Sequence, residues 1–509
     1  STFATSHHSL ADRGLWAGFR PDDAGARKKP GGPGRRHFML ERRTRGEVFT
    51  RIAGKANLRN PHSRGSNSMT LDPNLANLPF ERRVDFWTLG VLSSQPSSFL
   101  QILRALPGVF PSAVLASLRR LHRAGELATP TLRMLEVQAR RDDDFLPVDL
   151  TLPPPHPLNY EWRFTATGAQ VMLNTATRYC EADSHILMLG TPGVARSALG
   201  APPTQRLTFL GEDNHVTRVL ETENTSTGSP ITMRRCGHHL SRGLADVVLL
   251  DPPWYTDFVE RMLRSAAFAC KTGGIVLISL APLGANRSAF EHRSDTLTLA
   301  AAYGLRLEAI EDAALAYETP YFEANALRAS GLSAPTSWRN ADLAIFRKQK
   351  DLVGHTDTNS LDSERWAEVM IGRMRVFIRR DADVSPRSPW ALEPVVEGEI
   401  LPSVSRRDKR RLSVDVWTSG NRIFRCSRPD LLIAAATCSM AEFASVGRNA
   451  PHAGLLSEID AVSRLKYSLR KLASKETAEE RGVKIGGETW IRGSNLRNSP
   501  NTSTGTAGG

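Results

Sequence analysis

One short stretch combines residue types that bind and hold small molecules, namely Asp-Pro-Pro-Trp at residues 251–254, followed by Tyr255. It comes directly after Val247 to Leu250, an unbroken run of Val and Leu that is typical of a strand covered on both faces in a parallel sheet. The two prolines prevent further ladder pairing and stiffen the backbone. We therefore expect the Asp251 carboxylate at the carboxyl end of a buried strand, where open α/β sheets bind their ligands.

Two further loops are expected at the same edge of the sheet. Gly190 and Gly193 permit a tight turn from strand to helix, whose backbone can approach a ligand closely. Glu212 or Asp213 lies at the tip of the following strand, about twenty residues on, where a carboxylate commonly accepts hydrogen bonds from ribose hydroxyls. In series with residues 251–254, these loops predict a nucleotide-type site.

The elements that must position these loops alternate between strand and helix from His185 onward. A series of β-α-β units with crossovers predicts an α/β fold with a doubly wound, mostly parallel, Rossmann-like sheet. The expected strands are 186–189, 206–210, 245–250, 275–280, 306–310 and 341–346. We expect a helix after the first, third and fourth of these strands, and the last of the three helices spans about Ser288 to Tyr303.

This series resembles the class I S-adenosylmethionine-dependent methyltransferases over roughly residues 185 to 347. Residues Asp251, Pro252, Pro253 and Trp254 match the motif of the family members that methylate exocyclic amines, the N6-adenine and N4-cytosine enzymes. The family usually has an acid two residues before the first glycine of its cofactor loop, where this chain has Met188. The resemblance implies S-adenosyl-L-methionine as cofactor, held by Gly190, Gly193, Glu212 and Asp213.

The resemblance also implies roles for the motif. An exocyclic amine is a poor nucleophile because its lone pair is delocalised into the ring. Asp251 and the Pro252 carbonyl would accept its two hydrogens and favour the tetrahedral form, while Trp254, with Tyr255, would stack on the planar substrate. A base in duplex DNA would first be flipped out, at a cost of a few kcal/mol.

A second resemblance is to the branched-chain polyamine synthases, which join an N-terminal winged-helix domain to a methyltransferase-like domain and carry Asp-Pro-Pro followed by an aromatic residue. Those enzymes use decarboxylated S-adenosylmethionine as an aminopropyl donor. They carry a run of aspartates after the first glycine, where this chain has Thr191-Pro192-Gly193. A polycationic substrate should require more carboxylates than this loop offers.

Two aromatic segments are candidates for the substrate wall. The segment 156–164 contains Trp162, and it either forms a lid or covers the edge of the sheet. The segment 317–325 ends in Asn325, which could hydrogen-bond a base. Its alternative is an ordered loop packed on the sheet, which we favour because the segment carries no recognised motif.

The net charge of +13 is typical of proteins that bind nucleic acid, but the basic residues are unevenly distributed along the chain. Residues 1–68 hold 14 Lys and Arg against 5 Asp and Glu, a surplus of 9, in a Gly-, Ser-, Pro- and His-rich segment. We expect a disordered basic leader there, either appended to the protein or acting as a basic arm. Residues 486–509 are expected to be a disordered tail.

Four further segments complete the expected organisation. Residues 69–141 resemble a helix-turn-helix or winged-helix module, whose basic third helix (Arg119, Arg120, Arg123) either contacts DNA or belongs to a packing or dimerisation domain. Residues 142–184 form a linker and lid segment, and 185–350 the methyltransferase-like domain. Residues 365–475 form a separate α+β domain, with strands at 375–380, 411–417 and 422–426 and a helix at 431–443.

The amino-acid composition bears on metal binding, membrane association and the choice of partner. Five scattered cysteines form no paired motif, and Cys236-Gly237-His238-His239 lacks a second cluster, so we assign no metal ligands. No apolar run approaches a membrane span of about 18 residues, so we expect no membrane partner and a cytoplasmic location. Nucleic acid is the expected partner, with a homodimer as an option.

Three functions stay open. The leading hypothesis is an S-adenosylmethionine-dependent methyltransferase acting on an exocyclic amine, N6 of adenine in nucleic acid. The alternative is an aminopropyltransferase of the branched-chain polyamine synthase type. The third is a non-catalytic nucleic-acid-binding protein that kept the methyltransferase-like fold.

Overall fold

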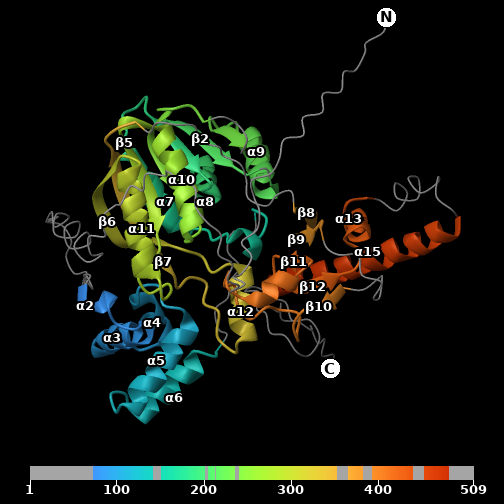
Figure 1. Cartoon of the computed structure of the whole chain (residues 1–509), viewed down its shortest axis with the longest axis horizontal. Coiled ribbons are helices and arrows are strands. Elements are labelled where there is room, and N and C mark those ends of the chain that lie inside the picture. The colour runs from blue at the N-terminus through green and yellow to red at the C-terminus, as the bar shows by residue number, and fades with distance from the viewer. Residues whose placement is uncertain are drawn as a thin grey trace, which may run out of the picture. The chain divides into compact units, whose positions relative to one another are not determined.

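The computed structural model describes residues 73–141, 151–200, 204–212, 214–235, 240–351, 365–381, 392–438 and 452–480. The larger of its two sheets has seven strands in the order β3-β2-β1-β4-β5-β7-β6. Figure 1 labels β2, β5, β6 and β7 of this sheet. Its strands are β1 (His185–Leu189), β2 (Arg206–Gly211), β3 (Thr232–Arg235), β4 (Ala245–Leu250), β5 (Cys270–Leu280), β6 (Leu305–Ala316) and β7 (Asn340–Lys348).

The sheet confirms the predicted doubly wound, mostly parallel Rossmann-like fold. Strands β1 to β5 pair in parallel, and only β7 runs antiparallel to its neighbours β5 and β6. The strand order reverses between β1 and β4, which pair with each other, and Leu189 is the partner of Leu250. Gly190 and Asp251, the next residues of the two strands, therefore begin neighbouring loops at the switch point where such sheets bind ligands.

Two layers of helices cover the sheet because successive side chains of a strand point to opposite faces. Ile186 and Met188 pack in one buried cluster with side chains of α7 (Ala166–Thr177), α8 (Pro192–Gly200) and α9 (His215–Thr227). Leu187 and Leu189 pack in another cluster with α10 (Thr256–Ala269) and α11 (Ala289–Ala302). Helix α7 lies in the segment predicted as linker and lid, so that part of the segment is instead a wall of the sheet's core.

Residues 73–141 form five helices and, within this described range, no strand. They are α2 (Pro73–Ala76), α3 (Phe80–Ser93), α4 (Phe99–Ala105), α5 (Pro111–Arg123) and α6 (Thr129–Gln138). The three predicted helices correspond to α3, α4 and α5, but the β-hairpin that would make a wing is not among these residues. The cluster of buried side chains in these helices extends to Phe290, Leu327 and Trp338 of the sheet domain.

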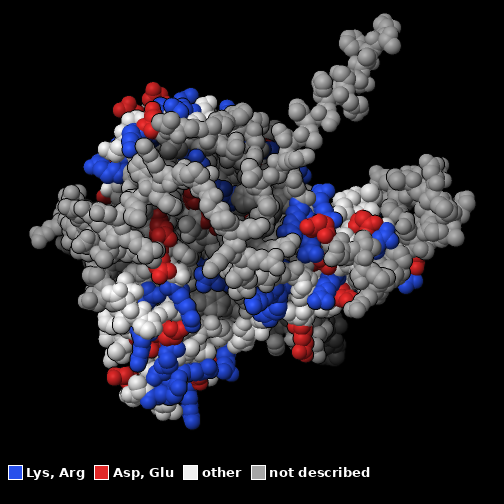
Figure 2. Space-filling model, in the orientation of Figure 1, with Lys and Arg blue, Asp and Glu red and all other residues white. Residues whose placement is uncertain are grey.

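Two arginines of the basic third helix form ion pairs within the helical domain. Arg120 forms an ion pair with Asp85 at 2.7 Å, and Arg119 pairs with Glu136 at 2.6 Å. Even so, Figure 2 shows Lys and Arg side chains gathered over the region where Figure 1 places α5 and α6. The DNA-contact hypothesis therefore stays a prediction.

The C-terminal part contains a five-stranded sheet in the order β10-β12-β11-β9-β8 and two helices. The predicted hairpin at Thr418 to Asn421 joins β11 to β12, whereas the predicted strand 411–417 is a 3-10 helix (Lys409–Ser413) followed by the short β11. The long α15 was not predicted. The elements are β8 (Trp366–Ile371), β9 (Met374–Arg379), β10 (Leu392–Pro394), β11 (Val416–Thr418), β12 (Ile423–Cys426), α13 (Pro429–Thr437) and α15 (His452–Glu480).

Several predictions fall outside the described residues, namely the leader 1–68, the tail 486–509, Asp213 and the Cys236–His239 cluster. Among the residues that are described, no group of three or more His, Cys, Asp or Glu side chains is arranged to hold a metal ion. None of the described helices is both long enough and apolar enough to cross a membrane.

Candidate functional site

Asp251 lies in a buried polar site at the carboxyl end of β4. Its Oδ1 accepts hydrogen bonds from the Ser279 hydroxyl on β5 and from the Tyr317 hydroxyl just beyond β6. Burial raises the pKa of the Asp251 carboxyl to about 7, and the two hydrogen bonds oppose that rise. The carboxyl group can therefore gain or lose a proton in the neutral pH range.

Two acceptors remain available beside these hydrogen bonds. Among the described residues, none donates to Oδ2 of Asp251 and none donates to the carbonyl of Pro252. The Pro253 carbonyl accepts from the Tyr255 amide at 2.7 Å, which turns the chain into α10. The motif thus presents two adjacent oxygens without protein donors, as an amine with two hydrogens requires.

Aromatic rings surround Tyr317, the residue that hydrogen-bonds to Asp251. The Tyr317 ring centroid lies 5.6 Å from that of Trp254, 6.1 Å from that of Trp162 and 4.7 Å from that of Phe164. Both Trp254 and Trp162 are edge-on to Tyr317, a favourable arrangement for aromatic pairs. Trp162 therefore lies in the same aromatic cluster as Trp254, and its contact with a substrate stays a prediction.

Backbone pairing holds the segment around Trp162 in place. Phe164 forms an antiparallel bridge with Tyr317, the Thr165 amide donates to the Ala316 carbonyl at 2.8 Å, and the Glu318 amide donates to the Arg163 carbonyl at 2.9 Å. The segment thus continues the β-pairing past the end of β6, and this places Trp162 next to the Asp251 loop.

Tyr255 lies in a neighbouring aromatic cluster. Its ring centroid is 4.9 Å from that of Tyr160, and Phe258 and the Arg406 guanidinium complete the cluster, with the Arg406 carbon 5.5 Å from the Tyr255 centroid. Arg406 also pairs with Asp257 at 2.9 Å, so the C-terminal part of the chain contacts the outer side of the motif. No described contact joins Tyr255 directly to the Asp251 carboxyl.

The glycine loop has the backbone that was expected at Gly190. This residue has φ of +60°, a conformation that favours glycine, and an added Cβ would approach Met262 to 3.2 Å. Gly193 has ordinary space around it, so its lack of a side chain is not required by the protein itself. The buried Thr191 hydroxyl between them has no hydrogen-bond partner among the described residues.

Glu212 directly follows β2, at the carboxyl edge of the sheet. The protein atoms around its carboxyl group desolvate it and raise its pKa. Arg375 of the C-terminal sheet opposes the rise, and the nearby carboxylates of Glu161 and Glu368 add to it. Glu212 is thus close enough to Arg375 and Glu368 of the C-terminal sheet for their charges to act on it.

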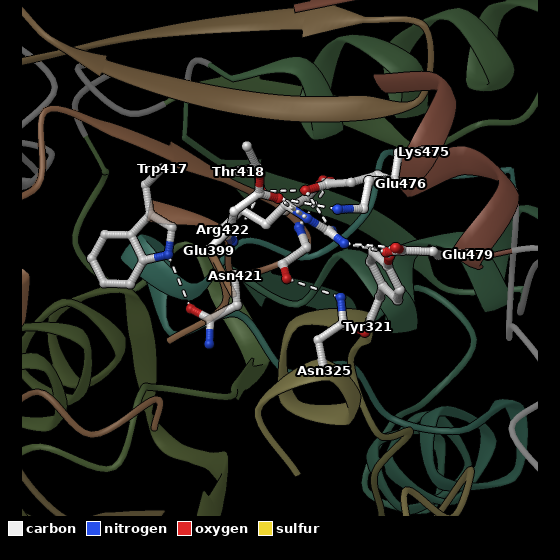
Figure 3. A network of polar contacts seen from close by, with 12 residues as sticks. Tyr321, Asn325, Glu399, Trp417, Thr418, Asn421, Arg422, Lys475, Glu476 and Glu479 are labelled. Carbon is white, nitrogen blue, oxygen red and sulfur yellow. Dashed lines mark hydrogen bonds and ion pairs between the residues drawn. The ribbon is translucent and has the colours of Figure 1, made fainter. Parts of the chain in front are cut away.

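Asn325 is not part of this arrangement. Residues 321–329 form the helix α12 (Tyr321–Ala329) rather than a loop, and the Asn325 amide donates to the Gly420 carbonyl at 2.9 Å. The Tyr321 hydroxyl on the same helix donates to Glu479 at 2.7 Å. Figure 3 shows both side chains directed into a network of the C-terminal hairpin and α15. The prediction that Asn325 contacts a base has no support from this position.

Sequence reasoning missed Ser279 and Arg339, and it included Tyr317 and Glu323 only as members of the candidate segment 317–325. Ser279 is near the end of a predicted strand, at the edge where ligands bind, and that position was an available signal. Tyr317, Glu323 and Arg339 come from segments without a recognised motif. The pairing of β6 with β7 brings these segments together, and it continues in a hydrogen bond of 2.9 Å from the Tyr317 amide to the Arg339 carbonyl.

Known proteins resemble this chain only weakly. No protein-family model matches the sequence, and no curated protein sequence matches it significantly. One similar solved structure is the branched-chain polyamine synthase from Thermus thermophilus in complex with N4-aminopropylspermidine and 5'-methylthioadenosine. Its sequence is 14% identical to this chain, the match covers 55% of this chain and 91% of that chain, and the TM-score is 0.41. A C9 mutein of that enzyme is 15% identical, with 62% and 97% covered and a TM-score of 0.40. A methyltransferase from Pyrococcus furiosus is 15% identical, with 36% and 84% covered and a TM-score of 0.26.

Proposed function

We propose that this protein is an S-adenosylmethionine-dependent methyltransferase that acts on an exocyclic amine, N6 of adenine in nucleic acid. The observation that carries the proposal is the pair of acceptors without donors among the described residues, Asp251 Oδ2 and the Pro252 carbonyl, beside the partly exposed ring of Trp254. An amine that donates one hydrogen to each oxygen becomes pyramidal at nitrogen, and its lone pair is no longer spread into the ring.

The neighbouring loop fits a sulfonium nucleotide. Gly190 turns the backbone tightly at the end of β1, the unpartnered Thr191 hydroxyl offers a polar group, and Glu212 offers a carboxylate for ribose hydroxyls. When bound, S-adenosylmethionine supplies an electrophilic methyl carbon. The residues of the chain orient the amine, and Asp251 can take up the proton that the amine loses after transfer.

A planar acceptor suits the surroundings of Asp251. Trp254, Tyr317 and Trp162 present ring faces and edges within one cluster, and such rings stack on a base whatever its sequence context. The chain also carries an excess of basic residues, which favours a polyanionic partner, although 9 of the 13 surplus charges lie in residues 1–68. Both features support nucleic acid as the acceptor.

Aminopropyl transfer to a polyamine is the second candidate. It is favoured by the order of the chain, in which a helical module precedes the sheet domain and packs against it through Trp338 and Leu327. The absence of carboxylates at Thr191 and Gly193 disfavours it, because a polycation needs several negative partners.

The test is incubation of the purified protein with labelled S-adenosylmethionine and separate pools of DNA, RNA, protein and polyamine. We expect label in a nucleic-acid pool and, after hydrolysis, in N6-methyladenine. Calorimetry with S-adenosylmethionine and its decarboxylated form gives the control. Preference for the decarboxylated donor, with label in polyamine, would replace the first candidate by the second, and binding of neither donor would contradict both.

The pH dependence of transfer provides a further prediction. Asp251 must be ionised to accept from the amine, so the rate should fall as pH drops below about 7. Tyr317→Phe removes a hydrogen bond that lowers this pKa, so the rising limb of the profile should move to higher pH. Single-turnover rates measured across the neutral range would show the shift. An unchanged limb in the variant would mean that another group controls the rate.

A further inference from the structure

Two buried side chains of opposite charge, Glu323 and Arg339, lie beside the candidate site and form few hydrogen bonds. Glu323, in the first turn of α12, is fully buried, and neither of its carboxylate oxygens has a hydrogen-bond partner among the described residues. Its nearest cation is Arg339, with 3.9 Å between Arg339 Nη2 and Glu323 Oε1. That distance keeps the charges together but is too long for a hydrogen bond.

Arg339 is held between tryptophan rings. The central carbon of its guanidinium lies 4.1 Å from the ring centroid of Trp162, 4.5 Å from that of Trp338 and 5.8 Å from that of Trp254. These rings fix the cation in place without using its N–H groups, because they attract it by its charge. No described residue accepts a hydrogen bond from the side chain, and its Nε is buried and unpartnered. The side chain is 14% exposed, so one part of it is open to a ligand.

The position of Arg339 links it to the acceptor. Trp254 contacts both Arg339 and Tyr317, and Tyr317 hydrogen-bonds to Asp251. An acceptor with its amine at Asp251 and its ring on Trp254 would extend toward the guanidinium. The N–H groups of Arg339 match the geometry of oxyanions, with which arginine forms paired hydrogen bonds.

Resting on the function proposed above, we infer that Arg339 binds a phosphate group of the acceptor and so selects a nucleotide over a nucleoside or a polyamine. Arg339 is then a specificity residue, and a polyamine would meet a fixed cation where it needs an anion. Glu323 is a positioning residue that holds Arg339 from behind with its charge.

Helix α12 gives Glu323 a rigid base. On another side of this helix, Tyr321 and Asn325 are hydrogen-bonded into the C-terminal network (Figure 3). Phe322 packs edge-on against Trp162, with 6.4 Å between ring centroids. Anchored from both sides, α12 keeps the carboxylate of Glu323 beside the guanidinium when the acceptor is absent.

The test compares the affinity of adenosine, adenosine 5'-monophosphate and a short adenine-containing oligonucleotide, measured from the quenching of tryptophan fluorescence. We expect the phosphorylated ligands to bind the unmodified protein about 10- to 100-fold more tightly than adenosine, the gain given by charge-assisted hydrogen bonds. Arg339→Gln should bring this ratio close to one and leave the adenosine affinity nearly unchanged. Spermidine should bind more weakly than the monophosphate.

The matched control is Arg347→Gln. Arg347 is an arginine near the other end of β7, where it pairs with Glu308, so it cannot reach the acceptor. Glu323→Gln, which keeps the shape, should lower the phosphate preference partially. Circular dichroism would establish that Arg339→Gln is folded. Arg339→Lys, which keeps the positive charge, should retain part of the preference for phosphorylated ligands that Arg339→Gln loses.

Two results would overturn the inference. One is equal affinity of the unmodified protein for adenosine and its monophosphate, and the other is an equal loss of both affinities in Arg339→Gln. These measurements need no transfer, so they are separate from the labelling experiment. Transfer to nucleosides without a phosphate preference would contradict the role of Arg339 alone, whereas label in none of the pools would contradict the proposed reaction.

Discussion

Replacement of Asp251 by asparagine should lower the rate of methyl transfer by about 10²- to 10⁴-fold, the range by which positioned proton acceptors accelerate reactions. The amide oxygen can still accept from Ser279 and Tyr317, so the fold should persist. In place of Oδ2, however, the variant presents an N–H group that repels the hydrogens of the amine. Single-turnover kinetics with saturating donor measure this loss.

Asp246→Asn is the control for that variant. Asp246 lies on the same strand, β4, at the opposite end, where it accepts from the His185 amide at 2.8 Å and from Lys271 at 2.7 Å. Its replacement should leave the transfer rate within about a factor of two, because only a surface ion pair is lost. Donor affinity in Asp251→Asn should stay within a few-fold of the unmodified protein. An equal loss of donor binding and rate would contradict the assignment of Asp251 to the amine.

Replacement of Arg422 by methionine should lower the free energy of unfolding by about 3–5 kcal/mol, as expected when a buried ion pair loses one partner. The Arg422 guanidinium is buried and donates to both oxygens of Glu479, at 2.7 and 2.6 Å, and to Glu476 at 3.3 Å (Figure 3). Burial already raises the pKa of Glu476 to about 7. Without the arginine, the two carboxylates would face each other in a desolvated site. Urea unfolding measures the change.

An exposed arginine in the same domain provides the comparison. Arg365 pairs with Asp381 at 2.9 Å, and both side chains are more than half exposed. Arg365→Met should therefore cost less than about 1 kcal/mol. Adding Glu476→Gln and Glu479→Gln to Arg422→Met should restore much of the lost stability, because no unpaired charge would remain. If Arg422→Met unfolds at the same urea concentration as Arg365→Met, the network does not stabilise the domain.

The sequence predicts the region around Asp251 better than the region around Arg422. The apolar runs of β1 and β4 and the residues that end them are local features, so Gly190 and Asp251 were expected at strand ends. Their adjacency depends on the pairing of Leu189 with Leu250, which brings together residues 61 positions apart. The fold class made this pairing an expectation, and the strand order confirms it.

Other elements had weak local signals. Helix α7 contains three Thr, one Asn and one Gly, residues with low helix propensity, and packing against α8 and the sheet decides its structure. Helix α12 begins after Pro320 with two aromatic residues, a pattern that a loop against the sheet also explains. The basic stretch after Lys409 was expected to be a strand, but it turns as a 3-10 helix because the Asp408 side chain caps it at the Arg410 amide.

The sequence by itself determined the type of sheet, the loops at its carboxyl edge and the Asp-Pro-Pro-Trp motif, because buried strands and the residues that break them are set by patterns over a few positions. Only the tertiary structure decided how the carboxyl group is tuned and which cation lies beside it. Tyr317 is 66 residues from Asp251, and Arg339 is held by Trp162 from a distant segment. Such contacts depend on burial and on strand register, which no local pattern specifies.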